Sequence, residues 1–394
     1  MIVQWRDRHY PIDWSGAVET TDKFLLPTRF SEQSNGVMAL GSGLSPSNGG
    51  RIVEGIKLRL LEWERAPTTS LPESAEDAVA IMALALRHTI STFEQIARKQ
   101  RGAVSRWRLN VGLPAAPWES RPLRNLTEQI ARGAFSVASV DVEVTRQVVK
   151  AALQGDAGAG STPVSVVAEF AAQLASYLRS PKRESDIHGL VDIGAGTVDF
   201  VSFNAHAAGS KHILPIASSA VRPLGSHYLL GALAGKPGQD RVWNDQDAIR
   251  DDGFFAEQNQ EQHCAVAHRR AVFGAAFRSC LNQMGEESIA WYPTSERFRS
   301  KPRKLPVFLC GGGSEISEYR TLLKTWCGLK VELRSLPVPE DMADTVDAAR
   351  FHRLSVAYGL SLLQRNVAEV RGKAESERME KPREIDFGDR DADR

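Results

Sequence analysis

The residues best suited to chemistry in this 394-residue chain are Asp192-Ile193-Gly194-Ala195-Gly196-Thr197-Val198-Asp199. Gly194 and Gly196 stand one residue apart between β-rich runs, so a tight turn there brings backbone N–H groups against phosphate oxygens without interference from Cβ atoms. Asp192 ends the incoming strand, where its carboxylate could organise a hydrated magnesium ion or orient an attacking water. The residues expected to bind phosphate are Gly194, Ala195, Gly196 and Thr197.

Two common glycine motifs do not fit this run. A dinucleotide fingerprint needs a third glycine where Asp199 stands and a helix after it, whereas a β-rich run follows here. A Walker loop needs a Gly-Lys-Ser/Thr sequence that the run lacks. The structural alternative is a plain β-hairpin with Asp192 exposed.

The run from Asp192 to Asp199 resembles the second phosphate loop of the superfamily that joins actin, the heat-shock chaperones and the sugar kinases, and is closest to the bacterial chaperone-like members. The resemblance implies an α/β fold with two ribonuclease-H-like lobes around a central nucleotide cleft. It also implies ATP and Mg²⁺ as ligands, with Asp192 at the metal.

Further motifs carry the same resemblance. A glycine run after the apolar strand Pro306–Cys310 resembles the adenosine loop, and Leu224-Gly225-Ser226 resembles a turn in which Gly225 offers an N–H to phosphate. The predicted adenosine-binding residues are Gly311, Gly312, Gly313 and Ser314.

Two predicted helices match the connecting helices of that superfamily. The helix expected at Val164–Leu178 carries Glu169 where a second catalytic carboxylate would stand, although a lone glutamate on a helix is usually solvated. The helix ending at Val356–Leu360 has small residues that would permit close packing between lobes, and ordinary helix packing is the alternative.

The first phosphate loop of the superfamily, an Asp-x-Gly-Thr/Ser turn, has no good match. Asp13-Trp14-Ser15-Gly16 has its glycine displaced, and Ile2–Trp5 aligns better with the second strand of the first lobe. Either the true start lies upstream of Met1 or the protein lacks this loop. Whether the protein is an enzyme therefore stays open.

The surrounding pattern alternates strands and helices, which indicates an α/β protein. The expected strands include a hairpin over residues 2–14, Trp107–Leu113, and a strand-turn-strand unit at Ile187–Phe203 with a partner at Lys211–Ala217. A long helix is expected from Ser74, as its N-cap, to Arg98. Shorter helices are expected at Leu126–Val137, Leu229–Leu233, His268–Met284, Ile316–Trp326 and Ala348–Leu363.

The length favours two lobes. The expected division is 1–178 for the first lobe, with its connecting helix at 164–178, and 187–365 for the second, with an inserted subdomain at 220–300. The segment 366–394 is dense in charge, so a flexible tail is predicted. Ile385 and Phe387 within it suggest a docking motif, with a plain solvated tail as the alternative.

Composition limits the partners. The formal net charge of +1 gives no global attraction to nucleic acid or anionic membrane. The four cysteines are too widely spaced for a metal knuckle, and no apolar run reaches membrane-spanning length, so a cytoplasmic location is expected.

The resemblance implies an ATP-binding protein that acts as a Mg²⁺-dependent ATPase and nucleotide-controlled conformational switch without a peptide-binding domain. A protein partner or self-association is expected alongside the nucleotide. A sugar kinase is disfavoured because no substrate signature is present. The alternative from another class is a non-hydrolysing pseudo-ATPase scaffold for protein–protein interaction.

Overall fold

The computed structural model describes most of the chain and has the expected α/β class. It describes residues 1–20, 22–41, 50–65, 71–104, 106–155, 163–208, 211–229, 260–299, 304–326, 329–342, 346–363 and 367–372. Most of the helix predicted at Leu229–Leu233, much of the predicted inserted subdomain and the end of the charged tail lie outside these ranges.

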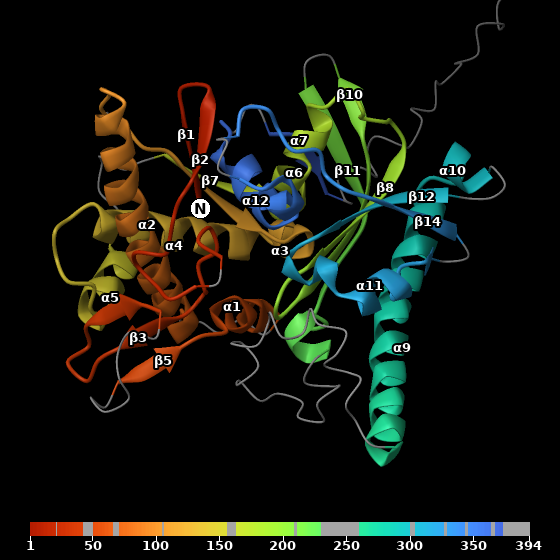
Figure 1. Ribbon diagram of the computed structural model, residues 1–394, viewed down its shortest axis with the longest axis horizontal. Helices are drawn as coiled ribbons and strands as arrows, with labels where there is room; N and C mark the ends of the chain where they lie inside the picture. Colours follow the sequence, from red (N-terminus) through yellow and green to blue (C-terminus); the bar gives the residue numbers. More distant parts are fainter. Residues whose placement is uncertain are drawn as a thin grey trace, which may run out of the picture.

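An eight-stranded sheet organises the second half of the chain (Figure 1). Its hydrogen-bonded order is β10-β11-β9-β8-β12-β14-β13, with β15 on β11. Strand β9 pairs antiparallel with both β8 and β11, whereas β12 runs parallel to β8 and β14 parallel to β12. Their bounds are β8 Ile187–Ile193, β9 Val198–Asn204, β10 His206–Ala208, β11 Lys211–Arg222, β12 Lys304–Cys310, β13 Thr325–Trp326, β14 Leu329–Arg334 and β15 Glu369–Arg371.

Helices cover both faces of this sheet because its central strands are apolar on both sides. Alternate residues of β8 enter different cores: Val191 packs with Phe277 of one helical layer, and Leu190 packs with Tyr358 of the other. The first layer comprises α9 Gln260–Trp291, α10 Glu296–Arg299 and α11 Ser317–Leu322. The second comprises α6 Glu169–Gln173, α7 Ala175–Leu178 and α12 Phe351–Ser361.

The first half of the chain forms smaller sheets and a helical group. The sheets are the hairpin β1 Ile2–Trp5 with β2 Arg8–Pro11, the unit β4-β3-β5 from β3 Phe30–Glu32, β4 Met38–Leu40 and β5 Arg51–Val53, and the parallel pair β6 Leu109–Leu113 with β7 Val164–Ala168. The helices are α1 Ile56–Arg65, α2 Glu73–Lys99, α3 Ala115–Glu119, α4 Arg121–Ala138 and α5 Arg146–Gln154.

Several sequence predictions are confirmed. The N-terminal hairpin, the strand before Pro114, the long helix near residues 74–98 and the strand-turn-strand unit with its partner are all present. The helices predicted at Leu126–Val137, His268–Met284 and Ala348–Leu363 correspond to α4, to α9 and to a short 3₁₀ turn followed by α12.

The helix predicted across Val164–Leu178 is wrong over its first part. Val164–Ala168 is the strand β7, and the helical region begins at Glu169. The segment is rich in β-branched valine, which favours extended backbone, and β6 supplies its parallel partner.

Other boundaries also needed correction. Ser74 is not an N-cap, because α2 starts at Glu73 after Pro72 and has no side-chain cap. The helix predicted at Ile316–Trp326 ends at Leu322, and Thr325–Trp326 pairs with β14. The tail predicted flexible from residue 366 contains β15, whose Val370 packs against the second helical layer.

Helix α12 joins the two halves of the molecule and lies near its centre in Figure 1. It packs against α6, where a Cβ at Gly359 would overlap the carbonyl oxygen of Ala172. Asn110 of β6 donates through Nδ2 to the carbonyls of Leu360 (2.7 Å) and Leu362 (2.8 Å). The close packing predicted for the small residues of this helix is therefore present.

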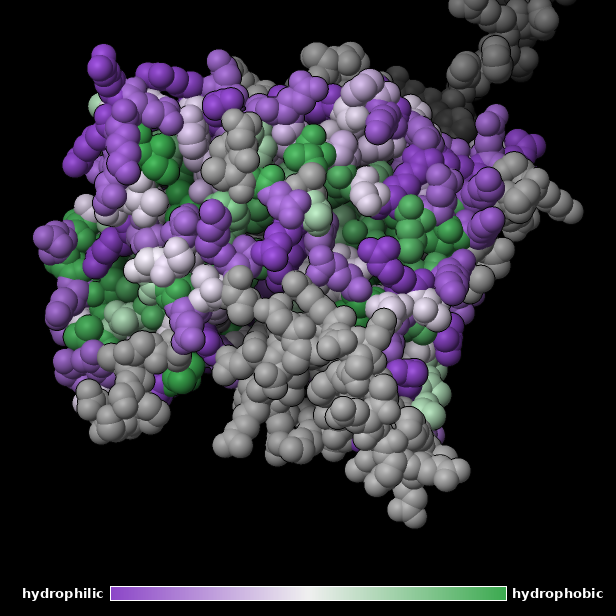
Figure 2. Space-filling view, in the orientation of Figure 1, coloured by the Kyte–Doolittle hydropathy of each residue, from purple (hydrophilic) through white to green (hydrophobic). Residues whose placement is uncertain are grey.

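Among the described residues, every helix is too short or too polar to cross a bilayer. On the face in Figure 2, hydrophilic side chains dominate the coloured surface and hydrophobic ones form separate small patches.

Candidate functional site

The centre of the candidate site is a pair of aspartates on neighbouring strands. Asp192 of β8 and Asp199 of β9 are directly opposite each other in the antiparallel register. Gln173, from the last turn of α6, donates through Nε2 to Asp192 Oδ2 at 3.0 Å. Since the strands flank a turn of only four residues, the sequence motif itself brings the two carboxylates together.

A lysine and a glutamate from the first half complete this charged cluster. Lys57 Nζ lies 3.0 Å from Glu169 Oε2, and the two side chains are 48% and 20% exposed. Lys57 is in the first turn of α1, and Glu169 is the first residue of α6. The charge on Glu169 also acts on Asp192, so these two predicted carboxylates lie near each other.

The pKa values of Asp192, Asp199 and Lys57 are shifted by desolvation and by one another's charges, which shows that these side chains lie close together. Desolvation raises the pKa of Asp192 to about 6, with a further contribution from the charge on Glu169, against the opposing effects of Lys57 and the Gln173 hydrogen bond. Desolvation also raises the pKa of Asp199. At Lys57 desolvation favours the neutral amine, but the charges on Glu169, Asp199 and Asp192 outweigh it and raise the pKa.

Some acceptor atoms of the cluster lack partners. Within the described part of the chain, Asp199 Oδ1 and Gln173 Oε1 are buried and accept no hydrogen bond. Buried acceptors without donors are costly, and a cation or its bound water would satisfy them. The residues present thus fit a hydrated Mg²⁺, although among the described residues no group of three or more His, Cys, Asp and Glu side chains is arranged for direct metal coordination.

The glycine turn between β8 and β9 presents backbone donors. Gly194 N–H donates to the Thr197 carbonyl at 2.9 Å. By contrast, the N–H groups of Ala195, Gly196 and Thr197 have no acceptor among the residues that the structure describes. Successive amides without a partner in a turn are the feature that backbone anion-binding sites use.

Gly225, the other residue predicted to contact phosphate, donates its N–H to a backbone carbonyl of the glycine turn. Gly225 N–H donates to the Gly196 carbonyl (3.4 Å), Ser226 N–H to Gly194 (3.0 Å) and His227 N–H to Ala195 (2.8 Å). A Cβ at Gly225 would lie 2.5 Å from the Ala195 carbonyl oxygen, so only glycine permits this contact. Gly225 supports the turn, and its amide is not available to a phosphate in this conformation.

The predicted adenosine loop lies beside the same cluster. Gly311 has φ +80, and a Cβ there would overlap Asp192 Oδ1 and the Ile193 carbonyl. A Cβ at Gly313 would overlap the Ile193 side chain. Ser314 is buried and its hydroxyl donates to the Gly311 carbonyl at 2.7 Å. The glycines therefore bring this loop against β8, and Gly312 is exposed.

Helix α1 is the element that the sequence did not identify as part of the site. Besides Lys57 it contributes Leu58, whose Cδ1 would be 3.1 Å from a Cβ at Gly196. Arg59 of α1 pairs with the fully buried Asp77 of α2 at 2.9 Å. Lys57, Leu58 and Arg59 thus contact, in turn, the charged cluster, the glycine turn and the buried Asp77 of the first half.

Sequence reasoning missed Lys57, Gln173 and the role of Asp199. Lys57 sits in a short amphipathic stretch with no recognisable spacing to the glycine turn, so no local signal marked it. Gln173 lies one helical turn after Glu169, which would have placed both on one face. Asp199 was within the motif, and its position opposite Asp192 follows from the hairpin.

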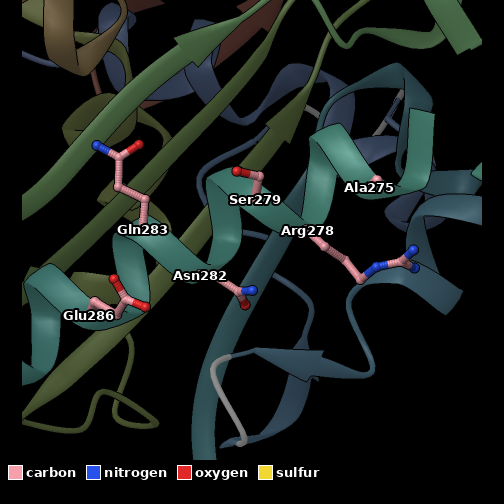
Figure 3. A pocket seen from close by; sticks show the side chains of 6 residues that line it. All are labelled: Ala275, Arg278, Ser279, Asn282, Gln283 and Glu286. Atoms are coloured by element: carbon pink, nitrogen blue, oxygen red, sulfur yellow. The ribbon is translucent and has the colours of Figure 1, made fainter. Parts of the chain in front are cut away.

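A surface hollow exists away from this cluster. It has a volume of about 510 Å³ and is lined by residues of α9 alone (Figure 3). All of them are exposed, so this is a solvated helix face, and we assign the site to the charged cluster instead. The lining residues are Ala275, Arg278, Ser279, Asn282, Gln283 and Glu286.

No protein-family model matches the chain, and no curated protein matches it.

Proposed function

We propose that the chain binds Mg²⁺-ATP at the cluster of Asp192, Asp199, Glu169 and Lys57 and uses the nucleotide as a conformational switch. The observation that carries the proposal is the coincidence of unpartnered amides at Ala195–Thr197 with neighbouring carboxylates whose ionisation is unfavourable. A divalent cation relieves that unfavourable charge, and the amides bind phosphate oxygens.

The sheet supports the same proposal at the level of fold. The order β11-β9-β8-β12-β14, with three antiparallel strands followed by two parallel ones, is the order expected of a ribonuclease-H-like lobe. Ligands of open α/β sheets bind beyond the carboxyl ends of the strands. Asp192 and Cys310 stand at those ends on adjacent parallel strands. A two-lobed actin-like fold is therefore our structural proposal.

Each residue then has a distinct role. The amides of the glycine turn hold phosphate oxygens, and Lys57 contributes the positive charge that offsets the developing phosphate charge. Asp192 and Asp199 would hold the waters of a bound Mg²⁺, and the ion would supply electrophilic activation of the phosphate. A carboxylate whose pKa is raised toward neutrality is suited to accept a proton from the attacking water. Hydrolysis would change how α12 and α1 pack, which is the signal passed to a protein partner or another copy of the chain.

A non-hydrolysing scaffold is the second candidate, and a specific observation favours it. The hairpin β1-β2 and the pair β6-β7 form separate sheets, and the turn of that hairpin carries no Asp-x-Gly-Thr/Ser sequence. Half a phosphate cradle would bind nucleotide without accelerating hydrolysis, because transition-state contacts are lost.

Hydrogen exchange tests the binding site. Mg²⁺-ATP is expected to slow exchange of the Ala195, Gly196 and Thr197 amides, whereas adenosine, which has no phosphates, is expected to leave them unchanged. Equal exchange with and without Mg²⁺-ATP at saturating concentration would refute the proposal. Phosphate release above the level of Asp192→Asn then decides between the ATPase and the scaffold.

A further inference from the structure

The segment between β2 and β3 carries a buried carboxylate that reaches α12. Asp22 is 8% exposed, and its Oδ1 accepts the Phe24 N–H at 3.1 Å. Its Oδ2 accepts from Arg350 Nη1 at 3.1 Å and lies 3.7 Å from Arg353 Nη1. A residue of the first half thus holds two arginines at the start of α12.

The segment around Asp22, residues 14–20 and 22–23, is anchored in a core of the first half. Trp14 is fully buried and stacks on His88 of α2, with ring centroids 4.9 Å apart. Trp14 N–H donates to the Lys23 carbonyl at 2.6 Å, and Val18 is buried in the same core cluster. Because the chain is anchored on both sides of Asp22, the carboxylate has little freedom to move away from α12.

The two arginines differ in what else they touch. Arg353 Nη2 and Nε lie 3.4 Å and 3.5 Å from the position of a Cβ at Gly312, the exposed glycine of the second glycine loop. The Arg353 side chain is 13% exposed, whereas that of Arg350 is 49% exposed. Arg353 is therefore fixed beside the open face of Gly312, and Arg350 shares its carboxylate partner while pointing more into solvent.

We infer that Arg353 contacts the nucleoside part of the bound nucleotide and that Asp22 is its positioning residue, an inference that rests on the proposed function. Asp22 pairs with Arg350 as well as Arg353, so it offsets only part of their combined charge, and its main effect on Arg353 is to hold the guanidinium beside Gly312. Guanidinium groups also stack their planar faces on aromatic rings. A ligand lying on Gly312 would meet this group, and a planar base is the chemistry that fits it.

The test compares Mg²⁺-ATP with Mg²⁺-tripolyphosphate, which lacks the nucleoside, by calorimetric titration of the full chain. Arg353→Gln is expected to weaken ATP binding about tenfold. Its affinity for tripolyphosphate should stay within a factor of about two, since the phosphate contacts remain. Arg350→Gln is the matched control and is expected to bind both ligands like the wild type.

Asp22 variants test the positioning role. Asp22→Asn is expected to lower ATP affinity several-fold without changing tripolyphosphate affinity, and Asp22→Glu should recover part of the loss because it restores the charge. Thermal unfolding of the ligand-free variants shows whether any loss of affinity merely follows a loss of stability.

The outcomes separate the two proposals. Failure of the wild type to bind Mg²⁺-ATP overturns the proposed function and this inference together. Wild-type binding of ATP with unchanged affinity in Arg353→Gln, or with equal losses in Arg353→Gln and Arg350→Gln, overturns the inference alone. An equal loss of ATP and tripolyphosphate affinity in Arg353→Gln assigns Arg353 to the phosphates and also refutes the inference.

Discussion

At the scale of single residues, the cluster around Asp192, which we propose as the ligand site, lowers the stability of the ligand-free protein. Like charges held together in a partly desolvated place raise the pKa of Asp192 to about 6 and also raise that of Asp199. The same arrangement that favours a divalent cation is unfavourable in the ligand-free protein. Active sites commonly show this conflict between function and stability.

Asp192→Asn should therefore be more stable than the wild type at pH 7 and similar at pH 4. A raised folded-state pKa means that the native protein binds more protons, so this group lowers the free energy of unfolding as pH rises from about 4 to about 6. After allowance for partial exposure, the gain at pH 7 is about 2 kcal/mol. Urea unfolding between pH 4 and pH 8 measures it.

Asp13→Asn is the control for that series. The Ser15 hydroxyl hydrogen bond holds the pKa of Asp13 below its usual range, so Asp13 stabilises the fold above its unfolded pKa and loses this effect as pH falls. The two variants should thus differ from the wild type in opposite directions at neutral pH. A stability gain in Asp192→Asn that does not change with pH would contradict the account.

At the scale of elements, close contacts decide which residues are tolerated on α12. Gly359→Ala places a Cβ on the carbonyl oxygen of Ala172, so α6 and α12 must separate. We expect a loss of about 2 kcal/mol or more in the free energy of unfolding, measured by chemical denaturation. Gly16→Ala has no heavy atom within 4 Å and should change stability little. Equal effects would refute the tight α6–α12 contact.

The salt bridges that link α1 and α5 to α2 lead to a second prediction at this scale. Asp77 is fully buried and pairs with Arg146 at 2.7 Å and with Arg59 at 2.9 Å. Asp77→Ala leaves both guanidinium groups without this carboxylate, and a destabilisation of about 2 to 3 kcal/mol is expected by chemical denaturation. Glu94→Ala removes an exposed partner of Arg98 and should cost less than about 0.5 kcal/mol.

The same elements show what the sequence could predict. The hairpin around Gly194 and the strand at Pro306–Cys310 were predictable because local apolar runs and glycines determine them. The helix predicted over Val164–Ala168 is wrong because the segment is a strand stabilised by pairing with β6, which lies more than 50 residues earlier in the chain. Lys57 could not be found, because only tertiary packing of α1 brings it to Glu169.

At the scale of the whole molecule, α12 connects the site to the first half. Its start is held by Asp22, its middle packs on α6, and its end accepts hydrogen bonds from Asn110 of β6. The glycine loop at Gly311 also donates to the His352 carbonyl of this helix (3.4 Å). A change at the glycine loops therefore has a direct structural route to the hairpin and the first-half sheets.

Calorimetric titration of Mg²⁺-ATP into the wild-type chain and into Asp192→Ala tests the central claim most directly. The account predicts saturable binding by the wild type and its loss in Asp192→Ala, with the fold of the variant intact by circular dichroism. Wild-type binding would also raise the free energy of unfolding by about 2.7 kcal/mol at a ligand concentration of 100 times Kd. Absence of binding by the wild type, or equal binding by both proteins, would contradict the assignment of this cluster as a nucleotide site.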